Sequence, residues 1–354
     1  MPAYGGPAYS VARLATALAE VGVDVGLWSS DRSTPPAAPV PAGARVRRLS
    51  GDESEALNEF GGADIIHDNG IWLPHNHRLA NIARSLHIPR IVSLRGMLEP
   101  WAIKHRFWKK RLAWQLYQRR DLKRAARHHA TAESEAENIG RFGLGVPISV
   151  IPNGVDVPEP RPCRINRSER VALYLGRIHP IKGLPMLIAA WARARPAGWR
   201  LTIIGPDEEG QRAVVQRAVA AAGLDDVVSF KEPVDGDAKR SAFYAADVFI
   251  LPSHSESFGV VVAEALAHGL PVLATTGAPW SMLPSKGCGW WVDASVDGLA
   301  GGLAEATAKD ADALAAMGAR GRAWVSAQFG WDRVARQFAA AYENVLARER
   351  QPVR

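Results

Sequence analysis

Cysteine and long apolar stretches are both scarce in this chain. Its 354 residues include two cysteines, Cys163 and Cys288, and their spacing matches no metal-binding pattern. The sequence therefore excludes a disulfide-stapled secreted domain and predicts two unpaired thiols in a reducing compartment. The longest apolar candidate, 258–278, is interrupted by charged residues and proline, so no run reaches the ~18 residues that a membrane span requires.

A targeting signal and a P-loop are also absent. The first ten residues, MPAYGGPAYS, have no basic region followed by an apolar core, so no signal peptide is predicted and the cytoplasm is the expected compartment. There is no G-x-x-x-x-G-K-[ST] motif, which excludes a P-loop nucleotide site. No metal site and no cofactor are expected.

The residues that are present have the balance of a globular protein with a basic surface. Apolar residues make up 47% and charged residues 22% of the chain, and the net charge is +7. The length favours two domains. The positive charge favours an anionic partner, such as a phosphorylated substrate or an anionic membrane surface. Nucleic acid fits the charge too, but the chain shows no nucleic-acid motif and no such partner is expected.

Short apolar segments alternate with helical patterns along most of the chain. Most of these segments lack a polar face, which indicates buried parallel strands. The predicted strands cover residues 23–29, 44–49, 63–68, 90–95, 127–133, 148–153, 170–177, 200–205, 226–231, 247–253, 271–276 and 289–293. Helical patterns lie at 8–22, 75–86, 134–142, 184–195, 209–223 and 259–269. The alternation predicts βαβ units with helices on both faces of a sheet.

A segment rich in proline and charge interrupts this alternation. NGVDVPEPRPCRINRSE (153–169) precedes the apolar run VALYLG and predicts a boundary between two doubly wound domains of similar size. In such sheets ligands bind outside the carboxyl ends of the strands. We therefore expect the site where those ends face a cleft between the domains.

Two cations follow the first strand of the second half. In LYLGRIHPIKGL (173–184) the strand is expected to end at Gly176, and Arg177 and Lys182 lie in the loop before a helix. Cations at the carboxyl end of a strand and beside a helix N-terminus suit a diphosphate. The alternative is a pair of solvated surface cations.

Two glutamates flank a loop of small residues further along. SHSESFGVVVAEALAHGLPV (253–272) follows a predicted strand, with Glu256 in the loop and Glu264 in the helix after it. Both acids are candidates for binding hydroxyl groups, with a ribose diol as the expected partner of Glu264. The loop amides that could donate to a ligand belong to Ser257, Phe258 and Gly259. The alternative for Glu264 is exposure to solvent or an ion pair with an arginine.

These segments together resemble a known family. GRIHPIKGL and SESFGVVVAEALAHGLPVLAT, with GADIIH and IPNGVD upstream, resemble the retaining GT-B glycosyltransferases of family 4, of the bacterial surface-polysaccharide type. The resemblance covers nearly the whole chain. It implies an α/β fold of two Rossmann-like, doubly wound domains facing a central cleft. Residues 1–155 would bind the acceptor, 156–330 would bind the nucleotide-sugar, and 331–354 would form a helix crossing back to the first domain.

The resemblance also implies a role for each residue of the motifs. Arg177 and Lys182 would neutralise the departing diphosphate and Glu256 would hold hydroxyls of the transferred sugar, which makes these three the predicted catalytic residues. Retention would proceed by same-face substitution, in which the leaving phosphate takes the acceptor's proton without a metal ion. The predicted donor-binding residues are Gly176, Ser257, Phe258, Gly259, Glu264, Gly5 and Gly6. An ordinary glycine turn is the alternative for Gly5 and Gly6.

The predicted acceptor domain carries two candidate contacts and one departure from the family pattern. His67, in HDNGIWLPHNHR, and Arg95, in SLRGMLEPW, are predicted to contact the acceptor. Many relatives place a histidine that meets the sugar where Arg95 stands, so Arg95 is expected to bind an acceptor phosphate instead. The family also begins with an apolar strand, whereas only MPAY precedes the glycine pair here. Either the true start lies upstream, or the first sheet closes without that central strand.

A basic and aromatic segment lies between the acceptor contacts and the domain boundary. Residues 101–127 include ten lysines or arginines, one aspartate and five aromatic residues. This composition is typical of an interfacial helix on a membrane surface, where a lipid-linked acceptor would lie. The alternative is a solvated basic helix that packs on the first domain through its aromatics.

The sequence as a whole predicts an enzyme. The expected activity is a retaining, metal-independent hexosyl transfer from a nucleotide-sugar donor to a saccharide or polyprenyl-linked acceptor in polysaccharide biosynthesis. The protein would be cytoplasmic or peripheral on the inner membrane. Two other hypotheses remain open: a nucleotide-sugar epimerase on the same fold, and an inactive carbohydrate- or nucleotide-binding partner of a membrane complex.

Overall fold

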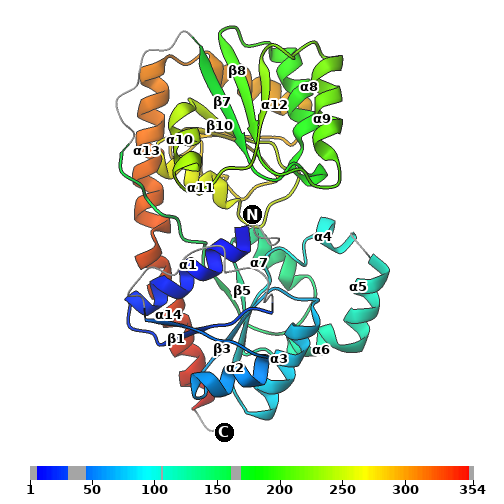
Figure 1. Ribbon diagram of the computed structural model, residues 1–354, viewed down its shortest axis with the longest axis vertical. Helices are drawn as coiled ribbons and strands as arrows, with labels where there is room; N and C mark the ends of the chain where they lie inside the picture. Colours follow the sequence, from blue (N-terminus) through cyan, green and yellow to red (C-terminus); the bar gives the residue numbers. More distant parts are fainter. Residues whose placement is uncertain (1–5, 31–44, 105–106, 161–168, 351–354) are drawn as a thin grey trace. The chain divides into compact units, whose positions relative to one another are not determined.

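The computed structural model describes residues 6–30, 45–104, 107–160 and 169–350. The chain divides into two compact units (Figure 1). The second unit is Val155–Gly330, and the first unit combines the chain up to Gly154 with the chain from Trp331 onward. Each unit is an α/β structure whose strands pair in parallel.

The second unit is built on a six-stranded parallel sheet in the order β12-β11-β10-β7-β8-β9. Its strands are β7 (Arg170–Leu175), β8 (Trp199–Ile204), β9 (Val228–Lys231), β10 (Val248–Leu251), β11 (Val272–Thr275) and β12 (Gly289–Val292). From β7 the chain winds outward through β8 and β9, and from β10 it winds the other way through β11 and β12. The winding direction therefore reverses between β7 and β10, where doubly wound sheets bind their ligands.

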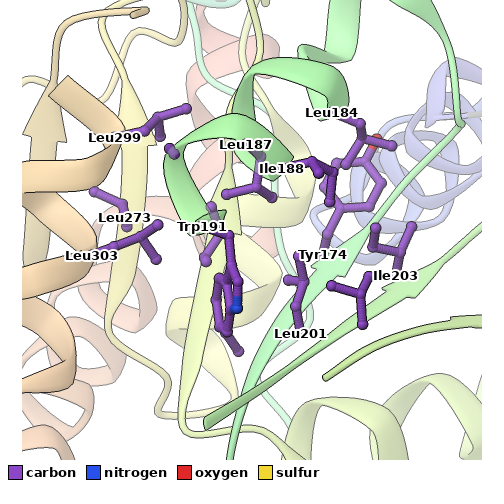
Figure 2. Packing of buried hydrophobic residues seen from close by; sticks show 14 of the residues in the cluster. Tyr174, Leu184, Leu187, Ile188, Trp191, Leu201, Ile203, Leu273, Leu299 and Leu303 are labelled. Carbon is purple, nitrogen blue, oxygen red and sulfur yellow. The ribbon is translucent and has the colours of Figure 1, made fainter. Parts of the chain in front are cut away.

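Helices cover both faces of this sheet. One face carries α8 (Leu184–Ala194), α9 (Gln211–Ala221) and α12 (Val296–Thr307), and the other carries α10 (Gly236–Ala245), α11 (Val260–Ala267) and α13 (Ala311–Phe329). Trp191 of α8 packs into the hydrophobic core between the sheet and α8, α9 and α12, beside Tyr174 and Leu201 of the sheet (Figure 2). Helices on both faces bury strand β10 along its whole length. Its sequence, VFIL, is therefore apolar at every position.

The first unit contains a four-stranded parallel sheet and a separate parallel pair. The sheet runs β3 (Ile66–Asn69), β4 (Arg90–Ser93), β5 (Arg127–Ala130) and β6 (Ile148–Val150), while β1 (Val25–Leu27) pairs with β2 (Val46–Arg48). Its main helices are α1 (Gly6–Glu20), α2 (Glu53–Phe60), α3 (Pro74–Ser85), α7 (Glu133–Gly140) and α14 (Trp331–Glu349). Between β4 and β5 lie α4 (Pro100–Lys104), α5 (Phe107–Ala113), a π-helix, η1 (Trp114–Gln118), and α6 (Arg119–Lys123).

An open slot separates the two sheets of the first unit. Among the described residues β1 pairs only with β2, and β3 pairs only with β4. Residues of both strands, Val25–Leu27 and Ile66–Asn69, line one cavity of about 1220 Å³. Residues of four helices, α1, α2, α3 and α14, line the same cavity. The cavity is therefore enclosed by helices in the way that a strand of the sheet would be. In the described chain, β1 and β3 therefore do not pair to close the sheet.

The C-terminal helix α14 packs on α1. Trp331, Val334 and Phe338 of α14 share a core with Leu14 and Leu18 of α1. The Trp331 ring lies against Gly154, where an added Cβ atom would come within 2.3 Å of the ring. A side chain at position 154 would therefore displace the start of α14. Across residues 6–30, 45–104, 107–160 and 169–350, no helix is both long and apolar enough to cross a membrane.

Candidate active site

Two loops of the second unit meet at the point where the winding reverses. One loop follows β7 and runs from Gly176 to Gly183, and the other follows β10 and runs from Pro252 to Gly259. Because β7 and β10 are paired neighbours in parallel, their carboxyl ends lie at the same edge of the sheet. The loops touch through their backbones, since the amide of His254 donates to the carbonyl of Ile181 at 2.8 Å.

A glycine makes this contact between the loops possible. Gly183 has a φ of +65°, and a Cβ atom built on it would lie 2.1 Å from the carbonyl oxygen of Pro252. Any other residue would force the two loops apart, because backbone atoms cannot move aside as a flexible side chain can. The sequence Ile-Lys-Gly thus holds Lys182 at a fixed place beside the second loop.

Lys182 and Glu256 form an ion pair across these loops. The Lys182 Nζ lies 2.5 Å from Glu256 Oε1, and their side chains are 14% and 13% exposed. The hydroxyl of Ser253 donates to the same carboxylate oxygen at 2.7 Å, and the Glu256 amide donates to the carbonyl of Gly277 at 2.8 Å. Two of the three predicted catalytic residues are therefore brought into direct contact.

Arg177 lies on the same edge with a different partner. Its guanidinium donates to both carboxylate oxygens of Glu208, at 2.7 and 2.9 Å, and its side chain is 48% exposed. The buried Tyr174 hydroxyl donates to the Arg177 carbonyl at 2.7 Å. Burial raises the pKa of Tyr174 well above its usual value, and the carboxylate of Glu256 raises this pKa further. The Tyr174 side chain therefore contacts Arg177 directly and lies near enough to Glu256 to be affected by its charge.

Glu264 lies in the second turn of α11 and pairs with a lysine. Its Oε1 accepts from Lys239 Nζ of α10 at 2.6 Å, with the carboxylate side chain 17% exposed. The alternative of an ion pair is thus realised with lysine rather than arginine. One carboxylate oxygen of Glu264 makes this contact, and a carboxylate has about four acceptor positions in total.

The loop before α11 is anchored by an aromatic side chain. The Phe258 ring is buried against Trp280 and Phe329, with ring centroids 5.3 and 5.8 Å apart, and its carbonyl accepts from Trp280 Nε1 at 2.6 Å. Gly259 follows with a φ of +75° and caps the helix. Ser257 and Gly259 flank this anchor, and the first amides of α11 have no acceptor within the helix. Gly176 follows directly after the last residue of β7.

His67 lies inside β3 and takes part in a buried chain of hydrogen bonds. Its Nδ1 is 2.6 Å from the Tyr342 hydroxyl, its Nε2 is 2.7 Å from Ser93 Oγ, and that oxygen is 2.6 Å from His129 Nδ1. His129 Nε2 donates to the Ile151 carbonyl at 2.8 Å, which fixes the direction of every bond back to Tyr342. Burial and then the charge of Arg95 lower the pKa of His67 to about 3. Both ring nitrogens of His67 are hydrogen-bonded within the protein, so neither is available to bind an acceptor substrate in this structure.

Arg95 follows β4 and has a φ of +52°, a backbone conformation that non-glycine residues rarely adopt. Its guanidinium donates to the side-chain oxygens of Asn69, at 2.8 Å, and Asn153, at 2.7 Å. Burial lowers the pKa of Arg95, although the charge of Glu135 opposes this shift. The cation is therefore held by two neutral amides. Of the glycine pair, Gly6 begins α1, and Gly5 lies outside the described residues.

Two family models match this chain. One, described as glycosyl transferases group 1, matches residues 169–309, and the other, a glycosyl transferase 4-like domain, matches residues 5–154. The chain belongs to the group 1 glycosyl transferases. The predicted family is therefore confirmed. Three of the motifs that carried the prediction lie within the two matched ranges, and IPNGVD extends two residues beyond the range that ends at 154.

Curated relatives of this group 1 glycosyl transferase include enzymes named for inositol acceptors. The D-inositol 3-phosphate glycosyltransferase of Actinosynnema mirum is 28% identical over 399 residues, which cover 96% of this chain and 92% of the relative. The GDP-mannose-dependent alpha-(1-6)-phosphatidylinositol monomannoside mannosyltransferase of Mycobacterium tuberculosis is 34% identical over 220 residues, 56% of each chain. A further D-inositol 3-phosphate glycosyltransferase, from Pseudarthrobacter chlorophenolicus, is 37% identical over 166 residues. That match spans 43% of this chain and 40% of the relative. The chain thus spans about half of the length of several of the curated relatives that it matches.

Solved structures share the fold. Sucrose-phosphate synthase from Thermosynechococcus elongatus superposes with a TM-score of 0.77 at 22% identity, covering 96% of this chain and 93% of that chain. Anabaena HepE in complex with UDP-glucose superposes with a TM-score of 0.72 at 18% identity and covers 97% of each chain. The predicted fold class, α/β of the GT-B type with two Rossmann-like units, is confirmed.

An Asp-x-Asp metal motif is not expected in a metal-free site, yet the sequence contains two Asp-x-Asp pairs. Asp235 and Asp237 stand at the start of α10, and Asp310 and Asp312 stand at the start of α13. Asp310 accepts from the Ala313 amide at 2.7 Å and caps its helix. In the described parts of the chain, no group of three or more His, Cys, Asp or Glu residues is arranged to hold a metal ion.

Sequence reasoning missed the partners of the predicted residues. Glu208 follows β8 in IIGPDEEG, and the rule that sites gather at the ends of parallel strands would have indicated it. Lys239 lies in a helix whose pattern gave no sign of a contact with Glu264. Asn69 is the last residue of β3 and Asn153 follows β6, so both could have been found by the same strand-end rule.

Proposed function

We propose that the protein transfers a sugar from a nucleotide-sugar donor to a hydroxyl of an anionic or lipid-linked saccharide acceptor, with retention and without a divalent metal. The observation that carries the proposal is the Lys182–Glu256 ion pair at the winding reversal, beside Arg177. Two cations and two carboxylates at the ligand-binding edge of a doubly wound sheet suit a ligand with both a diphosphate and hydroxyl groups.

Each cation is neutralised by a carboxylate in the structure described above. Lys182 pairs with Glu256, and Arg177 pairs with Glu208. A bound diphosphate would replace these carboxylates as the partner of the two cations, because it offers more charge and more acceptor oxygens. Once released from Lys182, the carboxylate of Glu256 would be free to accept hydrogen bonds from sugar hydroxyls. Binding of the diphosphate would thus replace the carboxylate partners of the two cations. It would not add a ligand to a site whose positive charge has no partner.

Charge on the leaving group grows as the bond between sugar and phosphate breaks. Lys182 is mostly buried, so its interaction with that charge is weakly screened by water. Such fixed charges stabilise the transition state more than the ground state. The same role is commonly taken by a divalent metal, and the two cations would supply it here. Glu264 would bind the ribose diol through acceptor positions that Lys239 leaves open.

The acceptor is proposed to carry an anionic or strongly hydroxylated group. Arg95 supports this proposal because its guanidinium donates to the neutral side chains of Asn69 and Asn153, and a phosphate is a stronger acceptor than an amide. The names of the relatives, with inositol phosphate and phosphatidylinositol mannoside, support the same acceptor chemistry. A lipid-linked precursor in surface-polysaccharide assembly has that chemistry as well.

The test is release of nucleoside diphosphate from UDP-, GDP- and ADP-sugars, measured with and without candidate acceptors. Release that depends on an acceptor, with an α-linked product from an α-linked donor, supports the proposal. Formation of an epimer without an acceptor would favour an epimerase, and tight binding without turnover would favour an inactive binding partner. A preparation stripped of metal ions by a chelator is expected to retain full transfer.

A further inference from the structure

The segment between β4 and β5 exposes an unusual number of apolar side chains. In the described parts of the chain nine large hydrophobic side chains are exposed, and five of them, Trp101, Phe107, Trp108, Leu112 and Leu116, lie in this segment. Trp108 is 74%, Leu116 65% and Leu112 58% exposed. Helices α4 and α5 extend at the margin of the first unit, beyond α3 and α6 (Figure 1). Exposed apolar groups gathered in this way mark an interaction surface.

The exposed residues share one face of the helix. Trp108, Leu112 and Leu116 recur every four positions along α5 and η1, which places them on the same side. The opposite side is packed on the unit: the Trp114 and Phe142 ring centroids are 5.2 Å apart, and Gln118 Oε1 accepts from the Trp72 amide at 3.0 Å. We call Phe107, Trp108, Leu112 and Leu116 the apolar ridge.

A cluster of cations lies next to the apolar ridge. A hollow of about 620 Å³ is lined by Trp114, Gln115, Arg119, Arg120, Lys123 and Arg124. We call this the cationic hollow. The only acid in residues 100–124 is Asp121, which is buried and bound to His77 at 2.5 Å. No carboxylate of the segment therefore neutralises the exposed lysines and arginines around the ridge.

We propose that the apolar ridge and the cationic hollow dock the protein on the surface of an anionic lipid bilayer. The ridge would enter the boundary between headgroups and acyl chains, and the cations would bind headgroup phosphates. Nucleic acid would use the cations but would leave Leu112 and Leu116 exposed. A protein partner would cover the ridge but needs no excess of positive charge. The bilayer is the partner that uses both features, and this inference goes beyond the proposed transfer reaction.

The test is sedimentation of the full chain with vesicles of phosphatidylcholine alone and of phosphatidylcholine mixed with phosphatidylglycerol. The wild type is expected to sediment with the anionic vesicles, to remain in solution with the neutral ones, and to bind less in high salt. Trp108→Ser with Leu112→Ser removes half of the ridge, and Arg119→Glu with Arg120→Glu reverses charge in the hollow. Each pair is expected to weaken partitioning on the order of tenfold or more.

A matched control changes the same kinds of residue elsewhere on the first unit. Leu86 is 55% exposed and lies near the exposed Arg84 at the end of α3, so Leu86→Ser with Arg84→Glu should leave partitioning unchanged. Equal binding by the ridge variant and the wild type would overturn the proposal, as would a wild type that ignores anionic vesicles. A dimer in solution that the ridge variant abolishes and vesicles do not compete with would also overturn it.

Nucleotide binding separates this proposal from the proposed function. Every variant above is changed in the first unit only, so its affinity for a nucleoside diphosphate should equal that of the wild type. A protein that binds nucleotide but no vesicle loses the docking proposal alone. A protein that binds vesicles but no nucleotide loses the proposed function and retains the docking surface.

Discussion

The Lys182 Nζ lies 2.5 Å from Glu256 Oε1, where the loops after β7 and β10 meet. Both side chains are mostly buried, so neither charge is well solvated and each depends on the other. An ion pair of this kind is costly to break unless a ligand replaces one partner.

Replacing Glu256 should abolish transfer without unfolding the protein. Glu256→Ala is expected to lower the transfer rate by about 10²–10³-fold or more, because the sugar loses a charged hydrogen-bond acceptor that is fixed in place. Product formation and circular dichroism are the measurements. Glu305→Ala, an exposed glutamate of α12, is the control. A Glu256→Ala enzyme that transfers at the wild-type rate would remove the assignment.

Replacing Arg177 should affect the diphosphate more than the nucleoside. Arg177→Ala removes a cation that would contact phosphate oxygens, and it leaves the groups that would contact the base and ribose in place. Titration calorimetry with a nucleoside diphosphate and with the free nucleoside is expected to show a loss of roughly tenfold or more for the diphosphate alone. An equal loss for both ligands would show that Arg177 acts through the fold.

Glu208 should act as a competitor of the diphosphate. Its carboxylate holds Arg177 in the structure, so Glu208→Gln is expected to tighten nucleoside diphosphate binding by a few-fold, within the range of an exposed ion pair. Asp297→Asn, which changes another exposed ion-paired acid of the same unit, is the control. Weaker binding by Glu208→Gln would mean that Glu208 positions Arg177 instead.

Acid should destabilise the first unit through its buried histidines. Burial lowers the pKa of His67 to about 3 and that of His128 to about 4, from a usual value of 6.5. At a pH between the folded and the usual pKa of each histidine, the unfolded chain binds a proton that the folded chain does not. The free energy of unfolding therefore falls as the pH drops below 6.5. Asp68, whose pKa burial raises to about 6, opposes part of this effect. The expected net loss from these three groups by pH 4.5 is on the order of 3 kcal/mol.

Urea denaturation at a series of pH values measures this dependence. His67→Gln removes one of the titrating groups and should make the dependence shallower by up to about 1.4 kcal/mol per pH unit. His254→Gln, at an exposed position of the second unit, is the control. A wild-type protein whose stability does not change between pH 6.5 and pH 4.5 would contradict the prediction.

The slot between β1 and β3 should accept an added strand. Both strands have one edge without a strand partner in the described chain, and both line the 1220 Å³ cavity. A short apolar, β-branched segment fused ahead of the chain is expected to raise the melting temperature by about 5 °C, because it would pair with both edges and fill the cavity. A Gly/Ser segment of equal length is the control. Equal melting temperatures for the two fusions would contradict the prediction.

The sequence by itself determined the strands and therefore the edge where the site lies. Each of the twelve strands in the described residues overlaps a predicted segment, although β3 and β8 each extend one residue beyond it. For strands such as β10 and β11 the agreement has a physical cause, because a parallel strand buried on both faces is apolar along almost its whole length. Gly-rich loops after two such strands then placed Lys182 and Glu256 near one another. Helices were predicted less completely, and α2, α10, α12 and α13 were missed.

Helix α13 shows why the tertiary structure had to decide the rest. Gly318 and Gly321 lower its intrinsic helix propensity, yet a Cβ atom at Gly318 would lie 1.8 Å from the Gly269 carbonyl oxygen and one at Gly321 would lie 2.6 Å from Leu266. The glycines are there for close packing on α11, which no local pattern reveals. The same holds for the charges of the site. Which carboxylate pairs with Lys182, Arg177 or Lys239 depends on contacts between residues 25 to 74 positions apart, and only the folded chain brings them together.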